Sequence, residues 1–125
     1  MINITFDEFN KLEFKLFENN PIIKNPLTSF VIADPSVITQ DVSHDKKFHL
    51  LCHTFFGVYM YDSNDGINFK KVKKITNRAM RPNINYIDGT YYLFYERTKP
   101  VICNLLSLIG LKWKSEIYCS VSTDL

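Results

Sequence analysis

The feature that most constrains this chain is an internal repeat. Residues 45–53, DKKFHLLCH, match residues 88–96, DGTYYLFYE, position by position, and residues 57–66, GVYMYDSNDG, match residues 116–125, EIYCSVSTDL. A repeat of about forty to fifty residues with several short strands is typical of β-propeller blades. The repeat therefore predicts two neighbouring copies of one small antiparallel sheet.

The first copy has the pattern of four strands joined by turns. The chain contains ten Phe and seven Tyr but only four Gly, and aromatic enrichment of this kind favours strands over helices. The predicted strands cover residues 30–38, 46–56, 57–63 and 67–75. Between the last two, the sequence SNDG predicts a tight hairpin in which Asp65 and Gly66 supply the positive φ angles.

The chain divides into three parts on this basis. Residues 1–33 form a lead-in with a short helix over residues 6–11 and a strand near residues 12–17, where Leu, Phe and Leu alternate. Residues 34–80 form the first blade and residues 81–125 the second, which carries an apolar insertion at residues 98–115. The second copy stops before a strand equivalent to residues 67–75, so we expect its blade to be incomplete. We also expect further blades, or a further chain, to complete the fold, and the isolated chain to be marginally stable.

Charge and hydropathy argue against two partner classes. The chain has fifteen Lys and Arg and thirteen Asp and Glu, and the resulting net charge of +2 gives no support to nucleic-acid binding. The basic run over residues 70–81 alternates with Phe69, Val72 and Ile75, as expected of an edge strand protected by lysines. The longest apolar run falls short of the roughly twenty residues that a membrane helix needs. The first residues do not resemble a secretory signal, so we expect a cytoplasmic protein without membrane contact.

Cysteine and histidine spacing gives no metal motif. Cys52, Cys103 and Cys119 are too far apart for a CxxC pair, and we expect buried, reduced thiols. His44, His49, Cys52 and His53 lie close in sequence, but Cys52 points to the opposite strand face from His49 and His53. We therefore predict no metal and no cofactor.

The order of the motifs resembles a known family. ADPSV, SNDGINF, RPNINYIDGTYYLFYE and VSTDL follow one another as in the five-bladed β-propeller glycosidases of glycoside hydrolase families 43 and 32, over residues 21–125. The resemblance implies an all-β fold: a partial five-bladed β-propeller with about two four-stranded antiparallel blades, the second incomplete. It also implies a hydrolase that acts on arabinan- or xylan-type carbohydrate.

The resemblance implies a catalytic role for Asp34, the acid of the ADP motif. In family 43 this Asp is the general base, and in family 32-like members the corresponding carboxylate is the nucleophile; an Asx-type turn before Pro35 is the alternative. Arg81 occupies the position of Asp34 one blade later and is a candidate sugar ligand, the alternative being contacts to strand carbonyls. His53, Phe55 and Phe56 are candidates for a sugar platform, with core packing as the alternative for at least one of the two phenylalanines. Glu96, which matches His53, is a further substrate-binding candidate or an edge residue.

The family's general acid is a Glu on a later blade, which this chain does not contain. We therefore expect no robust glycosidase activity from residues 1–125 alone, because positioned proton transfer contributes roughly 10²–10⁴-fold to such reactions. The alternatives are a non-catalytic carbohydrate-binding or accessory propeller and a scaffold that pairs its exposed edge with a partner.

Overall fold

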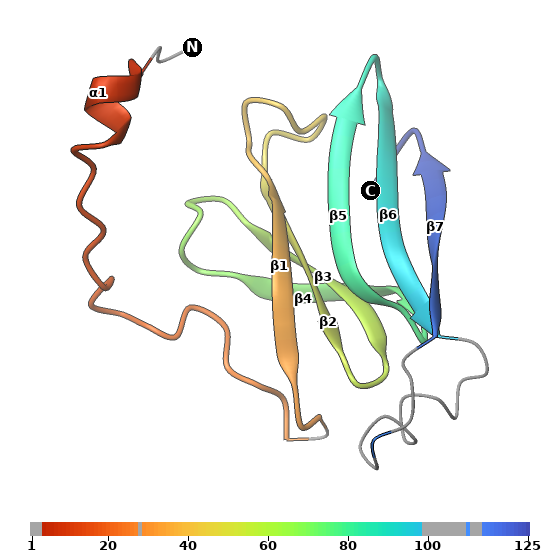
Figure 1. Ribbon diagram of the computed structural model, residues 1–125. Coiled ribbons are helices and arrows are strands. Elements are labelled where there is room, and N and C mark those ends of the chain that lie inside the picture. Colours follow the sequence, from red (N-terminus) through yellow and green to blue (C-terminus); the bar gives the residue numbers. More distant parts are fainter. Residues whose placement is uncertain (1–3, 28, 99–109, 111–113) are drawn as a thin grey trace.

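The computed structural model describes residues 4–27, 29–98, 110 and 114–125, which form two antiparallel sheets and one short helix (Figure 1). The first sheet has the order β1-β2-β3-β4 and the second the order β5-β6-β7. The elements are α1 (Phe6–Phe9), β1 (Ile32–Ile38), β2 (Phe48–Thr54), β3 (Gly57–Ser63), β4 (Lys70–Asn77), β5 (Met80–Ile87), β6 (Thr90–Thr98) and β7 (Ser115–Ser122). The predicted all-β fold is confirmed, with two sheets arranged as in a partial, unclosed propeller.

The strand prediction holds in outline and shifts at its ends. The first sheet has its four predicted strands in sequence order, although β4 begins at Lys70 and continues to Asn77. Strand β4 lies at the edge of the sheet, as the alternating lysines indicated. The ammonium group of Lys71 on β4 lies 3.8 Å from the centre of the Tyr59 ring. Among the described residues the second sheet has three strands. Most of the apolar insertion predicted at residues 98–115 lies outside the described residues.

Strand β2 is buried on both faces, and its alternating side chains serve two cores. Leu51 is fully buried between the two sheets, whereas Leu50 and Cys52 point to the other face and pack with Tyr61. The core between the sheets contains Ile38, Leu51, Val58, Met60, Ala79, Ile84, Tyr91, Leu93 and Tyr95. Strand β2 therefore packs on one face against the second sheet and on the other face against the cluster around Tyr61.

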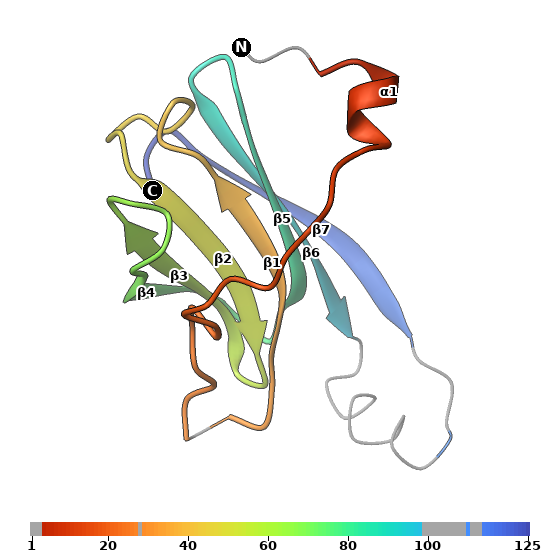
Figure 2. The same cartoon turned by 90° about the vertical axis from the view of Figure 1, so that its left-hand side faces the viewer.

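The two sheets meet along their first strands, β1 and β5, which run side by side in both views (Figures 1 and 2). The backbone N–H of Ile84 on β5 donates to the Ser36 hydroxyl on β1 at 3.0 Å. A second link joins the β1–β2 loop to β6, since the backbone N–H of His44 donates to the Tyr91 hydroxyl at 3.0 Å. This contact lies just beyond the ends of β1 and β5 and joins the two sheets there.

The repeat extends to the turn after the third strand. In the first sheet the Ser63 hydroxyl donates to the Asp65 carboxylate at 2.7 Å, and that carboxylate also accepts two backbone N–H groups at 2.8 and 2.9 Å. In the second, the Ser122 hydroxyl donates to Asp124 at 3.1 Å. Gly66 has the expected positive φ of 74°, but the expectation for Asp65 is wrong. Asp65 shapes the turn through its side chain instead.

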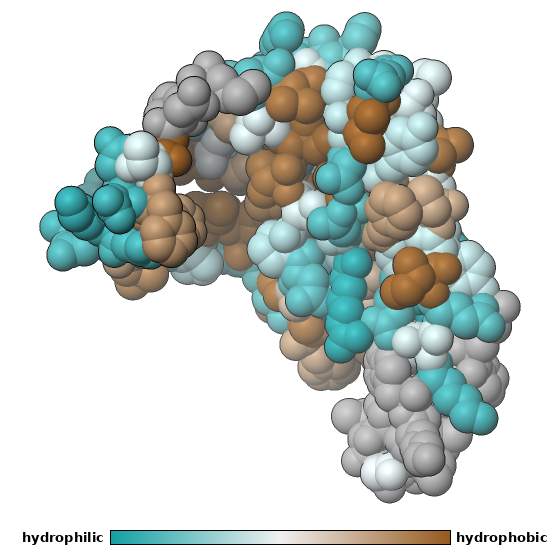
Figure 3. Space-filling view, turned by 45° about the horizontal axis from the view of Figure 1, so that its top comes forward, coloured by the Kyte–Doolittle hydropathy of each residue, from teal (hydrophilic) through white to brown (hydrophobic). Residues whose placement is uncertain are grey.

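The lead-in differs from its prediction. Thr5 and Glu8 form the expected capping box, but α1 ends at Phe9 rather than at residue 11. The strand predicted at residues 12–17 is absent, because a strand needs a neighbouring edge and none pairs with this segment. Phe14 and Leu16 are consequently 91% and 90% exposed. Figure 3 shows apolar surface both on this lead-in and on the two sheets.

Membrane-crossing helices are absent from the described part of the chain: α1, its one helix there, has four residues.

Candidate functional site

Asp34 lies in a β-bulge near the start of β1. Ala33 pairs with His53 and Ser36 with Leu51, so two residues of β1 oppose one residue of β2. Asp34 has a φ of 51°, which is uncommon for a residue other than glycine, and the following proline has no N–H for the ladder. The bulge turns the Asp34 side chain out of the regular alternation and leaves it 48% exposed.

Arg81 lies in the same kind of bulge at the start of β5. Met80 pairs with Glu96 and Asn83 with Phe94, so two residues again oppose one, and Arg81 has a φ of 50°. Pro82 follows it as Pro35 follows Asp34. The equivalence of Asp34 and Arg81 expected from the repeat is therefore present in the backbone itself.

Each bulge residue contacts a titratable side chain at the end of the neighbouring strand. His53 Nδ1 lies 3.2 Å from Asp34 Oδ2 on the first sheet, and Arg81 Nη1 lies 2.5 Å from Glu96 Oε2 on the second. His53 and Glu96, which match in the repeat, are both buried, whereas the Asp34 and Arg81 side chains are largely exposed. The two units thus carry the same pairing, with an acidic bulge residue in the first and a basic bulge residue in the second.

The two side-chain pairs meet where β1 and β5 adjoin. The backbone N–H of Arg81 points at His53 Nδ1, with 3.4 Å between the nitrogen atoms. Asp34, His53, Arg81 and Glu96 therefore form one group, which we call the charged cluster. Sequence reasoning named all four residues, but not their pairing. His53 differs from its prediction, since it is buried against Asp34 and offers no exposed platform.

The environment of His53 lowers its pKa below the ordinary value of 6.5. Burial has the largest effect, because it disfavours the charged ring. The Asp34 and Glu96 carboxylates act in the opposite direction and the Arg81 guanidinium acts with burial. The ring is therefore mainly neutral at neutral pH.

Phe55 lies two residues after His53, in the hairpin between β2 and β3. Its backbone N–H donates to the Ser29 hydroxyl at 3.2 Å, and its ring is 59% exposed. Phe56 beside it is 47% exposed, with the ring centroids 5.6 Å apart and the rings nearly perpendicular. Neither phenylalanine belongs to the core, so the core-packing alternative is wrong, and the exposed aromatic pair follows His53 in the hairpin.

A second polar group, missed from the sequence, surrounds His49. Its Nδ1 lies 2.8 Å from Asp62 and its Nε2 lies 2.7 Å from Asp45. Burial alone would raise the Asp45 pKa, but hydrogen bonds from His49 and from the backbone N–H of Lys47 lower it to about 2. These three side chains have potential metal ligands within 4.8 Å of one another. Both ring nitrogens are already engaged, however, so we interpret the group as a structural tie. It depends on the β2–β3 register, which pairs His49 with Asp62 and which the sequence pattern did not specify.

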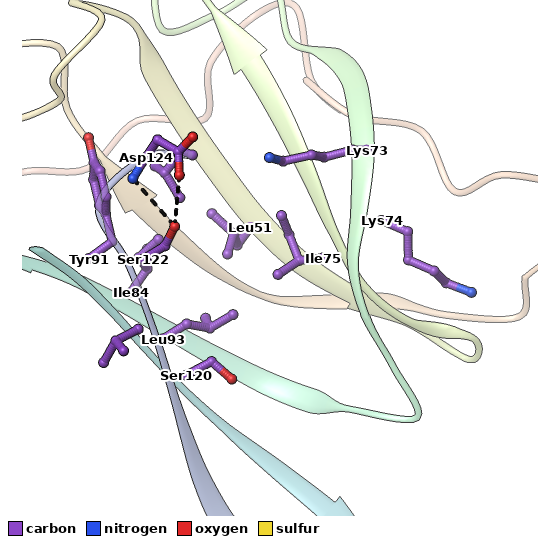
Figure 4. A pocket seen from close by; sticks show the side chains of 12 residues that line it. Leu51, Lys73, Lys74, Ile75, Ile84, Tyr91, Leu93, Ser120, Ser122 and Asp124 are labelled. Atoms are coloured by element: carbon purple, nitrogen blue, oxygen red, sulfur yellow. Dashed lines mark hydrogen bonds between the residues drawn. The ribbon is translucent and has the colours of Figure 1, made fainter.

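A pocket of about 270 Å³ lies between the sheets and is lined by Tyr91, near the start of β6 (Figure 4). Glu96 of the charged cluster lies near the other end of that strand. Leu51, Ile84 and Leu93 form its apolar wall, and Lys73 points towards it. It does not include any residue of the charged cluster.

No protein-family model, curated protein or solved structure matches this chain.

Proposed function

We propose that this chain forms part of a glycoside hydrolase, in which Asp34 is the general base or nucleophile and arabinan- or xylan-type chains are the substrate. The observation that carries the proposal is the charged cluster, where the exposed Asp34 carboxylate on one bulge contacts His53, which also contacts the backbone of Arg81 on the other bulge. Glycoside hydrolysis needs one carboxylate near the anomeric carbon and one carboxylic acid to protonate the leaving oxygen. Asp34 suits the first role by its exposure on the bulge of β1.

Arg81 and Phe55 supply the expected sugar contacts in this proposal. A guanidinium donates directed hydrogen bonds that suit hydroxyl or carboxylate groups, and an exposed aromatic ring offers an apolar face to the CH groups of a pyranose. Glu96, by contrast, is buried and holds Arg81 rather than reaching substrate itself.

The ion pair of Glu96 also favours the second candidate function, a non-catalytic carbohydrate-binding module. The Glu96 carboxylate is buried and already engaged with the Arg81 guanidinium, so it does not reach the leaving oxygen of a glycoside. The cluster therefore supplies one carboxylate for chemistry and no general acid, so binding without hydrolysis is the alternative for this chain. A cytoplasmic location stays a prediction of the sequence.

The partner is proposed from the second sheet's outer face. There Phe94 and Ile117 are 41% and 74% exposed, while Leu51 and Val58, their equivalents in the repeat, are buried against the second sheet. A further sheet, from additional blades or another chain, would bury this face as the second sheet buries the first.

The test combines hydrolysis and binding on the purified chain. Aryl arabinosides and xylosides report turnover, and titration calorimetry with arabino- and xylo-oligosaccharides reports binding. We compare the wild type with Asp34→Asn and Phe55→Ala. The control is Phe14→Ala, which removes an exposed aromatic ring from the lead-in.

We expect binding that Phe55→Ala weakens and Phe14→Ala leaves unchanged. Turnover that Asp34→Asn abolishes supports the hydrolase, and binding without turnover supports the binding module. Absence of both binding and turnover, on a chain that is folded by circular dichroism, contradicts both functions.

A further inference from the structure

The Nδ1 atom of His53 faces two partners that it cannot serve at once. Asp34 Oδ2 lies 3.2 Å away and only accepts hydrogen bonds, so it requires a proton on Nδ1. The backbone nitrogen of Arg81 lies 3.4 Å away and only donates, so it requires the lone pair of an unprotonated Nδ1. The two contacts therefore belong to two different states of the ring.

The protonated ring has one possible arrangement. An imidazolium carries protons on both nitrogens, so Nδ1–H donates to Asp34 and the Arg81 N–H loses its acceptor. The carboxylate is then held against β2 by a charge-assisted hydrogen bond.

The neutral ring with its proton on Nε2 reverses both contacts. The Nδ1 lone pair accepts the Arg81 N–H, which ties the second bulge to the first sheet. That lone pair faces the Asp34 oxygen without a hydrogen between them, so the carboxylate loses its partner in β2 and turns to solvent, to which it is already about half exposed.

The charged groups around the ring come from three strands: Asp34 from β1, Arg81 from β5 and Glu96 from β6. Glu96 and Arg81 pair with each other, so their effects on the ring largely cancel. The second blade has no comparable exchange, because Glu96 stands where His53 would be and its ionised carboxylate only accepts hydrogen bonds. The exchange is thus confined to the half of the cluster that carries Asp34.

We infer that His53 is a positioning residue whose Nδ1 exchanges between a hydrogen bond donated to Asp34 and one accepted from the backbone N–H of Arg81, so that its protonation sets whether the Asp34 carboxylate is held or released. The inference rests on the proposed function only in taking Asp34 as the reacting group. At neutral pH the carboxylate is released and able to accept a proton; in acid it is held by the imidazolium.

Nuclear magnetic resonance of the ring nitrogens tests the exchange directly on the whole chain. The chain has three histidines, and long-range ¹H–¹⁵N spectra show which nitrogen of each ring carries the proton. His44 is exposed and serves as the reference for an unconstrained ring. At neutral pH we expect the His53 proton on Nε2, with Nδ1 unprotonated.

On acidification, His53 gains a proton on Nδ1, and we expect the Asp34 carboxyl ¹³C resonance to move in the same titration step. A neutral His53 ring with its proton on Nδ1 would overturn the inference, because the ring would then donate to Asp34 in both states.

Two variants separate positioning from a merely structural role. Asp34→Asn removes the carboxylate charge, so the pKa of His53 should fall by about 1, whereas an unchanged pKa contradicts the pairing. His53→Asn places an amide near the Nδ1 position that does not titrate, so the Asp34 step linked to His53 should disappear. Should His53→Asn fail to fold, the wild-type titration and Asp34→Asn decide the question. None of these measurements uses carbohydrate, so the exchange stands or falls separately from the proposed function.

Discussion

Replacing Gly57 by alanine tests how the hairpin before β3 supports the site. Gly57 has a φ of 129°, and an added Cβ would lie 2.2 Å from the backbone oxygen of Thr76 and 3.1 Å from the backbone nitrogen of Arg78. The Thr76 carbonyl belongs to β4, so relief of the contact requires the start of β3 to separate from the end of β4. The next turn leads directly into the bulge of Arg81.

The magnitude follows from two contributions. A non-glycine residue at this φ costs roughly 1–3 kcal/mol of backbone strain. Separating Gly57 from its partner Asn77 loosens edge hydrogen bonds worth about 1 kcal/mol each. We therefore expect Gly57→Ala to lower the free energy of unfolding by about 3 kcal/mol.

Gly89→Ala is the matched control. Gly89 also has a positive φ, 82°, but nothing lies within 4 Å of an added Cβ. Its cost is the conformational one alone, roughly 1–2 kcal/mol. Urea unfolding followed by far-ultraviolet circular dichroism measures both variants against the wild type. Equal destabilisation by the two substitutions would refute the steric argument.

Three further predictions concern the core, the turns and the thiols. Leu51→Ala should lower the free energy of unfolding by about 3 kcal/mol, because the side chain is fully buried between the sheets, whereas Val72→Ala, half exposed on β4, should change it by less than about 0.5 kcal/mol; urea unfolding checks both. Hydrogen bonds from the turn lower the pKa of Asp65, so its contribution to stability is present above its ordinary pKa near 4 and is lost as the pH falls through the lowered value. Asp65→Asn should therefore weaken the dependence of the free energy of unfolding on pH in acid, and an unchanged dependence would argue against this. Burial raises the pKa of the Cys52 thiol to about 11, so iodoacetamide at pH 8 should label exposed Cys119 and spare Cys52 until the chain is unfolded, as peptide mass spectrometry can show.

Local sequence patterns determined the strands of this protein and the equivalence of its two units. Strand alternation, turn residues and the order of motifs depend on neighbours in the chain, so they were readable without a structure. The same repeat placed Arg81 with Asp34 and Glu96 with His53. All four members of the charged cluster, together with Phe55 two residues after His53, could therefore be named from the sequence.

Only the tertiary structure decided how these residues interact. The pairs Asp34–His53 and Arg81–Glu96 depend on bulges that shift the strand register by one residue. The contact between His53 and Arg81 depends on β1 lying beside β5. The tie between His49 and Asp62 likewise needs the β2–β3 register. The alternation at residues 12–17 suggested a strand, but no edge pairs with it in the structure. Pairing between strands is a property of their packing, which local alternation and turn chemistry do not specify.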